Sequence, residues 1–506
     1  MSRTRTPTFV LELPLSVDGA AERALRVRFE AARHLYNACL GEALRRLRAM
    51  QSSDVYRQAR ALPAGPARRE AYRLAARAHG FTEYALHAWA ARCKNACWIG
   101  EHLDANVVQT LASRAFDAVL RYALGRRGRP RFKGRLHALG AVEGKTNAAG
   151  IRWRDGQVLW RGLVLRARLD PRDRDGVQAF ALQRPVKRVR LVRRRLRGRL
   201  RWYVQLVLEG RPRWKPRHRV ADGVVGLDVG PSTVAAVGAD AALLERFCDE
   251  VVFLQREIRR ILRAMDRSRR ATNPGNYLPD GTVRPGRKRW VFSRRYVRLL
   301  GRLQELHRRM AAARRTAHGR LAHRILAMGR VVRTERLDYR PFQRRFGRSV
   351  RDRAPGAFLA LLRRKAASAG GAVEEFATRE TRLSRTCHCG RIEPKPLAQR
   401  WHRCPCGTGP VQRDLYSAYL ARFVENGRLD TSRAAAAWAG AESLLRDAVS
   451  RLEQSASGRA LPASFGLGRR RSGSHPEGRS CRAEAAAAPQ GRRAERCGNH
   501  GQNPLA

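Results

Sequence analysis

Three acidic residues in the second half of the chain have the sequence context of metal ligands. Asp228 ends a short apolar strand, Glu335 ends a later predicted strand, and Asp414 begins a predicted helix. Hydrolysis of a phosphodiester bond by two metal ions needs carboxylates that hold divalent cations about 3.5–4 Å apart, and oxygen ligands favour Mg²⁺. Gly226 and Gly230 flank Asp228, which lets a phosphate approach the strand closely. An acid after a strand is also a common turn or capping residue, so the pattern alone leaves both interpretations open.

Four cysteines form a second group. The sequence reads CHCG at 387–390 and CPCG at 404–407, two C-x-C knuckles with fourteen residues between them. Four thiolates at such a spacing can surround Zn²⁺ tetrahedrally. Each knuckle is one residue shorter than the usual C-x₂-C pattern, so His388 or His402 remains an alternative to one thiolate, and four free thiols are a second alternative. The predicted zinc ligands are Cys387, Cys389, Cys404 and Cys406.

The charge of the chain restricts its partners. Its 506 residues include 104 Lys and Arg against 43 Asp and Glu, a net charge of +61, and only eight of the basic residues are Lys. This balance excludes most metabolic enzymes and favours nucleic acid as the partner, because each cation docked on a phosphate releases counterions. Guanidinium groups suit phosphate better than ammonium groups do. We expect no membrane partner, because no apolar run is long enough to span a bilayer. The sparse cysteines predict a reducing cytoplasm.

The first half of the chain is predicted to be mostly helical and then rich in strands. The predicted elements are a strand at 8–15 and helices at about 18–60, 66–98 and 107–124. After a Gly and Arg stretch at 125–135 the apolar period changes from 3.6 to 2. Residues 186–208 indicate a basic hairpin, on which Trp202 and Tyr203 could stack nucleic acid bases. A linker at 211–219 places a domain boundary near 220.

The second half alternates between strand and helix patterns. The predicted elements are strands at 223–230, 233–237, 331–335 and 371–378, and helices at 243–265, 294–328 and 357–369. From about 455 the sequence consists of Gly, Ser, Arg, Ala and Pro with scarcely any core-forming residue, which predicts a disordered tail. Together the two halves predict an α+β, multidomain fold.

The order of the motifs resembles a known family. GVVGLDVGPSTVAAVG at 223–238, VVRTERL at 331–337, the two cysteine knuckles and QRDLYSAYLA at 412–421 are similar to the RuvC-type nuclease of TnpB (OrfB) proteins, which insertion sequences encode. The same motifs resemble the related small type V CRISPR effectors. The resemblance covers roughly Asp222 to Val424, with weaker similarity upstream.

The resemblance implies a fold and a division into domains. It implies an RNase H-like (RuvC) α/β nuclease domain with an inserted zinc-binding element, after an N-terminal half that combines helices with a β-barrel. The implied domains are 1–219, the barrel (wedge) with an inserted helical recognition region; 220–380 and 411–440, the two parts of the nuclease; 381–410, the zinc-binding element for target nucleic acid; and 441–506, a helix followed by a disordered basic tail.

It also implies an activity. Asp228, Glu335 and Asp414 would be the catalytic ligands of Mg²⁺, and the four cysteines would hold a structural Zn²⁺. The implied reaction is RNA-guided cleavage of DNA, with a guide RNA and a target double-stranded DNA as partners. The expected location is the bacterial cytoplasm, in association with the nucleoid.

The sequence departs from the family at two positions. Arg336 follows Glu335 where the family commonly has another acid, and Tyr416 stands where it usually has Asn. With the shortened knuckles, these departures indicate a divergent subgroup that keeps all three acids. Two alternatives remain: a type V CRISPR effector, and a nucleic-acid-binding protein that has lost cleavage. A third possibility is a transposase that joins DNA ends. The last is disfavoured because the recognisable chemistry is hydrolytic.

Overall fold

The structure, a computed structural model, describes residues 6–134, 138–396, 398–456 and 461–467. The chain has a mixed α/β, multidomain architecture and divides between Arg213 and Trp214 into an N-terminal unit and a C-terminal unit. This division falls inside the stretch 211–219 that the sequence marks as a linker. None of the helices in the described ranges combines the length and apolarity that crossing a bilayer requires.

The N-terminal unit contains two antiparallel sheets. The first has the order β1-β7-β6-β2, with β1 (Thr8–Pro14), β7 (Arg199–Glu209), β6 (Val186–Leu196) and β2 (Ala141–Glu143). The second consists of β3 (Arg152–Arg154), β4 (Gln157–Trp160) and β5 (Leu163–Arg166). Leu15, just after β1, bridges to Ala167, just after β5. Pairing among the described strands leaves both sheets open, so the closed barrel stays a prediction.

Helices complete the N-terminal unit. They are α1 (Gly19–Ser52), α2 (Asp54–Ala61), α3 (Pro66–Ala78), α4 (Glu83–Asn95), α5 (Ile99–His102), α6 (Ala105–Ala123) and α7 (Val177–Leu182). Asp18 caps α1 by accepting a hydrogen bond from the Ala21 amide at 2.7 Å. Trp202 is only 4% exposed and meets the Phe29 ring edge-on at 5.0 Å. The expectation that Trp202 stacks on bases is therefore wrong, because its face of the hairpin packs on α1.

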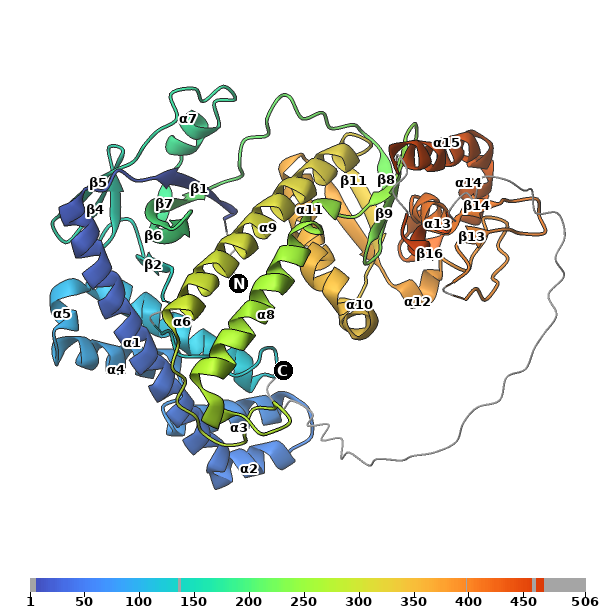
Figure 1. Ribbon diagram of the computed structural model, residues 1–506. Helices are drawn as coiled ribbons and strands as arrows, with labels where there is room; N and C mark the ends of the chain where they lie inside the picture. The colour runs from blue at the N-terminus through green and yellow to red at the C-terminus, as the bar shows by residue number, and fades with distance from the viewer. Residues whose placement is uncertain (1–5, 135–137, 397, 457–460, 468–506) are drawn as a thin grey trace. The chain divides into compact units, whose positions relative to one another are not determined.

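The C-terminal unit is organised around a five-stranded sheet in the order β10-β9-β8-β11-β12 (Figure 1). The strands are β8 (Val224–Val229), β9 (Thr233–Val237), β10 (Ala242–Arg246), β11 (Val331–Glu335) and β12 (Ala372–Phe376). The pairs β8–β9 and β9–β10 are antiparallel, whereas β8–β11 and β11–β12 are parallel. Two parallel strands therefore end side by side in the middle of the sheet.

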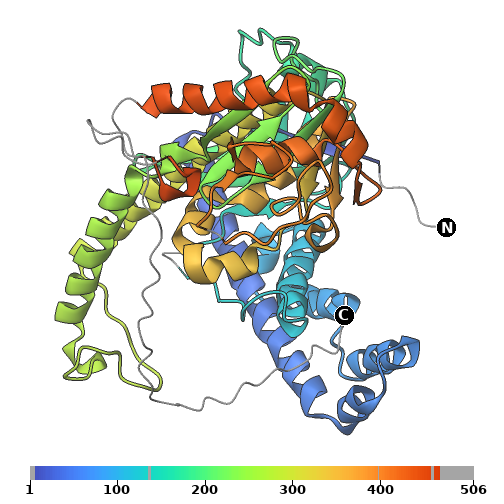
Figure 2. The same cartoon turned by 90° about the vertical axis from the view of Figure 1, so that its right-hand side faces the viewer.

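Helices cover both faces of this sheet. The helices on one face are α8 (Leu254–Thr272), α9 (Arg294–Leu326), α10 (Tyr339–Arg353) and α11 (Pro355–Ser368). The other face carries α13 (Arg413–Ala421) and α15 (Trp438–Ala456), and Figure 2 shows α15 running across it. Side chains of β9 alternate between the two cores, with Val234 and Ala236 in one and Ala235 and Val237 in the other. The unit is thus a three-layer α/β/α arrangement.

Two expectations are wrong in this unit. Residues 243–265 do not form one helix: Ala242–Arg246 is an edge strand paired with β9, and α8 begins only at Leu254. Disorder from residue 455 onward is also wrong for residues 461–467, where Phe465 is completely buried in the core beside α13 and α15. Trp401 Nε1 donates to the Gly466 carbonyl at 2.9 Å. Leu461 and Leu467, which are partly buried, pack against the same core. Residues 468–506 of the expected tail lie outside the described residues.

Candidate functional site

Asp228 and Glu335 lie next to each other at the ends of two parallel strands. Leu227 of β8 stands opposite Thr334 of β11 in the register, so the following residues, Asp228 and Glu335, are also neighbours. Side chains at equivalent positions of paired strands point to the same face of a sheet. The sequence placed each acid at a strand end, and the parallel pairing brings these two ends together.

Helix α13 carries the third acid to the same place. Asp414 lies in its first turn and is 8% exposed. Thr233 of β9 donates its hydroxyl hydrogen to Asp414 Oδ2 at 3.2 Å, which ties the start of the helix to the strand next to Asp228. The Gln412 side chain accepts a hydrogen bond from the Leu415 amide at 2.9 Å and caps the helix.

The three carboxylates interact electrostatically. Burial and the nearby charges of Asp414 and Glu335 raise the pKa of Asp228 well above its usual range. Burial raises the pKa of Glu335 to about 7 and also raises the pKa of Asp414. Limited contact with water and nearby negative charges favour the protonated form of a carboxyl group. A cation close to the carboxyl groups favours the ionised form instead. A group of acids of this kind is a candidate site for divalent cations.

Two arginines that the sequence reasoning missed stand beside the acids. Arg400 Nη1 lies 3.6 Å from Asp414 Oδ1, and Arg413 Nε lies 3.9 Å from the same atom. Arg413 also donates to the carbonyls of Pro396 at 3.2 Å and Gln399 at 2.8 Å. Both guanidinium groups lower the pKa of Asp414, against the effect of burial. Arg413 directly precedes the acid and could have been noticed, whereas nothing in the sequence connects Arg400 to it.

The residues at the acid site fit Mg²⁺. The carboxyl oxygens of three different elements form an all-oxygen donor set, which is the set that Mg²⁺ prefers. Among the described residues, only the four cysteines bring three or more ligand atoms within 4.8 Å of one another. The carboxylate oxygens of the three acids are therefore further apart than the ligand atoms around one metal ion would be.

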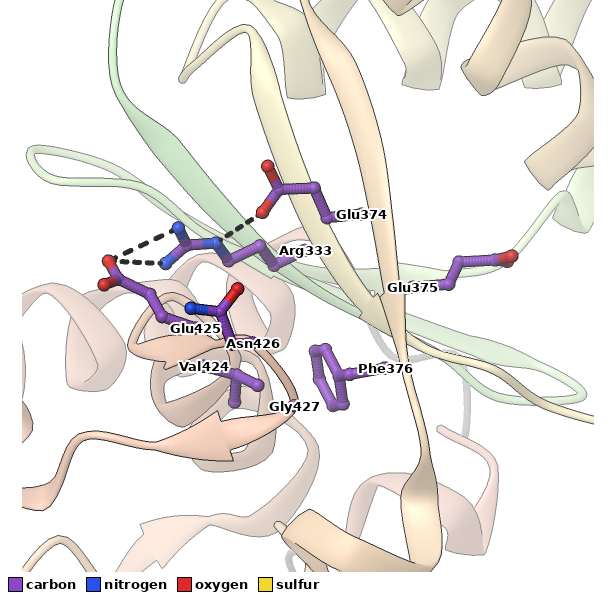
Figure 3. Close-up of a pocket in the computed structure, with 8 residues that line it drawn as sticks. All are labelled: Arg333, Glu374, Glu375, Phe376, Val424, Glu425, Asn426 and Gly427. Atoms are coloured by element: carbon purple, nitrogen blue, oxygen red, sulfur yellow. Dashed lines mark hydrogen bonds and ion pairs between the residues drawn. The ribbon is translucent and has the colours of Figure 1, made fainter.

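A cavity of about 520 Å³ lies between β11, β12 and the segment that follows α13 (Figure 3). Arg333 crosses it and binds Glu374 at 2.9 Å and Glu425 at 3.4 Å. Arg333 Nη1 also donates to the Arg422 carbonyl at 2.7 Å, just past the end of α13. In Figure 3, Glu375 points away from this group. These ion pairs hold the carboxyl end of α13 and the segment after it against β11.

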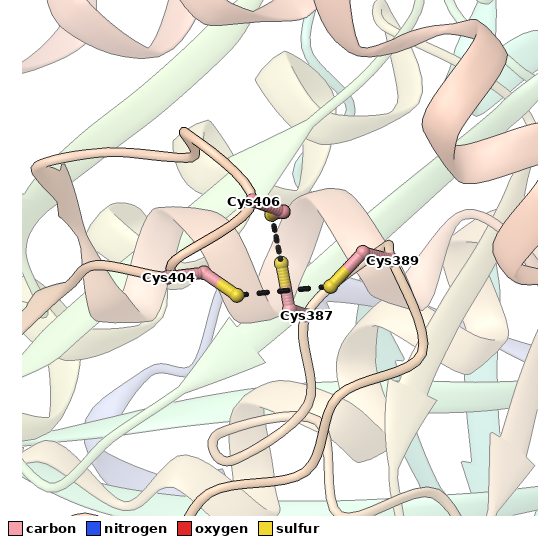
Figure 4. A group of neighbouring side chains, drawn as sticks. All are labelled: Cys387, Cys389, Cys404 and Cys406. Carbon is pink, nitrogen blue, oxygen red and sulfur yellow. Dashed lines mark hydrogen bonds between the residues drawn. The ribbon is translucent and has the colours of Figure 1, made fainter.

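The four predicted cysteines come together (Figure 4). Cys387 Sγ lies 3.6 Å from Cys406 Sγ, and Cys389 Sγ lies 3.7 Å from Cys404 Sγ. A zinc ion with Zn–S bonds of about 2.3 Å holds tetrahedral sulfurs about 3.8 Å apart, so both separations match. The four-cysteine group can therefore hold a metal ion, as the sequence predicted.

The two histidines take other roles. His388 Nδ1 lies 3.0 Å from the Tyr416 hydroxyl, and its Nε2 lies 3.3 Å from the Thr408 hydroxyl. The His402 ring stacks on the Tyr416 ring with a centroid distance of 4.2 Å. Neither histidine belongs to the group of ligand atoms. The structure thus favours four thiolates over the alternative with a histidine ligand.

Comparisons with known proteins identify no family. No family model matches the chain, and no curated protein matches it. Solved structures do match, among them a cryo-EM structure of a Cas12f1–sgRNA–target DNA complex, with 12% identity over 82% of this chain and 98% of the other and a TM-score of 0.39. A second is a cryo-EM structure of a CRISPR–Cas12f ternary complex, with 12% identity over 82% of this chain and 87% of the other and a TM-score of 0.23. At such TM-scores the likeness assigns neither a fold family nor an activity to the chain.

Proposed function

We propose that the chain is an RNA-guided DNA endonuclease of TnpB type that hydrolyses phosphodiester bonds with two divalent metal ions. The observation that carries the proposal is the convergence of three acids that are far apart in the sequence: Asp228 of β8, Glu335 of β11 and Asp414 of α13. The nearby charges of Asp414 and Glu335 contribute to the raised pKa of Asp228. Asp414 is buried, and Asp228 and Glu335 are partly buried. Repulsion among carboxylates placed in this way is unfavourable, and a pair of cations would relieve it.

The sheet supports an RNase H-like nuclease domain. The resemblance implies an α/β nuclease domain, and the mixed five-stranded sheet, in the order β10-β9-β8-β11-β12 with helices on both faces, is compatible with one. The acids stand on its central strands and on the helix that covers them. The inserted element with the four cysteines directly precedes α13, where the resemblance implies a zinc-binding part for target nucleic acid.

The chain's own residues would hold and orient the reacting groups. Asp228, Glu335 and Asp414 would hold the two Mg²⁺ ions, which when bound activate water and stabilise the leaving oxygen. Thr233 fixes the Asp414 carboxylate through its hydroxyl hydrogen bond. Arg400 and Arg413 place positive charge beside Asp414, which would attract the scissile phosphate.

The proposal includes a guide RNA and a double-stranded target DNA as partners. The net charge of +61 supports binding to polyanions. The tip of the hairpin β6–β7 adds a local cluster of exposed arginines: Arg195, Arg197, Arg199 and Arg201. Dependence on a guide RNA rests on the motif resemblance alone.

One observation favours a second candidate, a targeting protein that binds nucleic acid without cutting it. The Arg400 guanidinium already provides a positive charge 3.6 Å from Asp414. A cation supplied by the protein can satisfy an acid in place of a metal ion, and such a site would not hydrolyse DNA. Retention of all three acids argues for the nuclease.

The decisive experiment compares binding and cleavage in the same preparation. The full chain is purified with its co-purifying RNA, the RNA is sequenced, and a duplex that matches it is offered with Mg²⁺. We expect the wild type to cut, and Asp228→Ala to bind the duplex within a few-fold of wild type without cutting. The matched control is Asp222→Ala, because the Asp222 side chain is 87% exposed and only six positions upstream.

Three outcomes would count against the proposal. A wild type that binds but never cuts in Mg²⁺ or Mn²⁺ supports the binding protein. Cleavage by Asp228→Ala places the active site elsewhere. Absence of a discrete co-purifying RNA removes the guided mechanism.

A further inference from the structure

Tyr416 connects the acid-bearing helix with the four-cysteine group. It lies on α13 two residues after Asp414, and its side chain is 1% exposed. Its hydroxyl donates to Cys387 Sγ at 3.3 Å and accepts a hydrogen bond from the His388 amide at 2.9 Å. Residues two apart on a helix point in nearly opposite directions, so α13 presents Asp414 to the sheet and Tyr416 to the cysteines.

The Tyr416 hydroxyl belongs to a network of polar contacts that includes His388 and Thr408. His388 Nδ1 lies 3.0 Å from this hydroxyl, and His388 Nε2 lies 3.3 Å from Thr408 Oγ1. If Nδ1 carries the imidazole proton, it donates to the tyrosine oxygen, and the tyrosine hydrogen is free for the Cys387 sulfur. A thiolate accepts a hydrogen bond more strongly than a neutral thiol does. Metal binding, which deprotonates Cys387, would therefore favour the hydrogen bond from the Tyr416 hydroxyl to the Cys387 sulfur.

The Tyr416 ring contacts the second half of the cysteine element. It stacks on His402, which lies on the short strand β13 (Trp401–His402) that leads into Cys404. Trp438 meets the same ring edge-on at 5.5 Å. One side chain of α13 thus contacts the first knuckle through its hydroxyl and the approach to the second knuckle through its ring.

The cysteine element also frames the start of α13 directly. Strand β13 pairs with β14 (Val411–Gln412), which runs straight into the helix. Arg400, the residue before β13, lies 3.6 Å from Asp414. A displacement of the segment between the knuckles would therefore move the surroundings of Asp414.

We propose that Tyr416 is a positioning residue through which metal binding at the four cysteines regulates the acid site. A bound metal holds the two knuckles together, the knuckles hold Tyr416, and Tyr416 holds α13 in the position that places Asp414 beside Asp228. Loss of the metal separates the knuckles and lowers the affinity of the acid site for divalent cations. This inference rests on the proposed function, because it takes the three acids as a divalent-cation site.

The test uses Tyr416→Phe, which keeps the ring and removes the hydroxyl. Tyr419→Phe is the matched control, because it also removes a buried tyrosine hydroxyl from α13, one that donates to the Ala434 carbonyl and not to the cysteine element. In protein loaded with Co²⁺ at the cysteines, Tyr416→Phe should shift the thiolate-to-cobalt charge-transfer band. The affinity for zinc should fall about tenfold, as for other lost hydrogen bonds to metal ligands, so a chelator should remove zinc more readily. Tyr419→Phe should change neither.

The link to the acids is measured with Mn²⁺ binding followed by electron paramagnetic resonance. Tyr416→Phe should weaken Mn²⁺ binding several-fold and raise the Mg²⁺ concentration for half-maximal cleavage by a similar factor, while cleavage at saturating Mg²⁺ falls less. An unshifted cobalt band with normal zinc release would overturn the Tyr416–Cys387 contact.

The remaining outcomes separate this inference from the proposed function. A shifted cobalt band with wild-type Mn²⁺ affinity would overturn the regulation while leaving the nuclease intact. Wild-type protein that binds Mn²⁺ at the acids but never cuts would contradict the proposed function alone. Wild-type protein without any Mn²⁺ affinity at the acids would overturn both.

Discussion

Gly226 and Ala418 bring strand β8 and helix α13 into direct backbone contact. A Cβ atom placed on Gly226 would stand 1.8 Å from the Ala418 carbonyl oxygen. Real Cβ atoms do not approach an oxygen this closely, so a glycine is required at this position. The close approach lets α13 lie across β8 with Asp414 near the end where Asp228 stands. The spacing of the two elements is thus set by the absence of one methyl group.

Gly226→Ala should therefore lower both stability and activity. Because the clash is with backbone, α13 must shift, and overpacking of this kind costs about 1–3 kcal/mol or more. Urea denaturation should show this loss, and Mg²⁺-dependent cleavage should fall with it. Gly440→Ala on α15 is the control, since a Cβ there meets nothing within 4 Å. Alanine in a helix gains about 0.5–1 kcal/mol over glycine, so the control should melt slightly higher. Equal stability of Gly226→Ala and wild type would contradict the contact.

The segment around Phe465 should behave as part of the folded unit. Phe465 is fully buried, and the Ser464 and Ser232 hydroxyls lie 3.3 Å apart, next to the Thr233 that binds Asp414. A chain that ends after residue 467 should melt like the full chain. A chain that ends after residue 456 should lose about 3–5 kcal/mol, as for removal of a buried Phe side chain, and should cut poorly even when guide RNA is supplied separately.

Phe465→Ala in the full chain separates the side chain from the chain length. In a calorimetric melt, Phe465→Ala should show most of the loss of stability that is expected for the chain ending after residue 456. If both truncated chains melt alike, the segment is not anchored in the core.

The sequence predicts the ligands better than their surroundings. Four cysteines in two short knuckles form a local pattern, so the metal group can be predicted from their spacing. Ala242–Arg246 cannot be identified as a strand in this way, because its leucines continue the apolar spacing of α8 and only pairing with β9 decides its conformation. Phe465 is a single aromatic residue in a stretch of low complexity. Its burial depends on a core that distant segments build, as does the position of Arg400 beside Asp414.

Replacement of Cys404 should remove the metal from the cysteine group. Cys404→Ser takes away one of four thiolates, and structural zinc contributes directly to folding free energy. Elemental analysis should find about one zinc per wild-type chain and much less in the variant, whose melting temperature should fall. Cys97→Ser is the control, because the exposed Cys97 thiol donates to the Cys93 carbonyl at 3.1 Å and lies outside the metal group. Zinc content that stays unchanged in Cys404→Ser would contradict the assignment of the ligands.

Glu335→Gln should stabilise the metal-free protein while it abolishes cleavage. Burial raises the pKa of Glu335 to about 7 from an ordinary value of 4.5. Between these two values the folded chain binds more protons than the unfolded chain, so the stability contributed by this residue falls as the pH rises and is lowest above pH 7. Glutamine removes the charge. In the presence of a chelator the variant should therefore melt above the wild type at about pH 8, and the difference should shrink towards about pH 4.5.

Mg²⁺ should reverse the order of the two melting temperatures. A cation that binds only the folded state stabilises that state, and Glu335→Gln lacks one of the carboxylates that would bind the cation. At pH 8 Mg²⁺ should raise the melting temperature of the wild type more than that of Glu335→Gln. Glu442→Gln on α15 is the control, since the Glu442 side chain is exposed and pairs with Arg446 at 3.1 Å. Scanning fluorimetry across pH 5–8, with and without Mg²⁺, measures both effects. Parallel pH profiles of wild type and Glu335→Gln without metal would show that burial does not raise the pKa of Glu335, and would weaken the electrostatic support for the acid site.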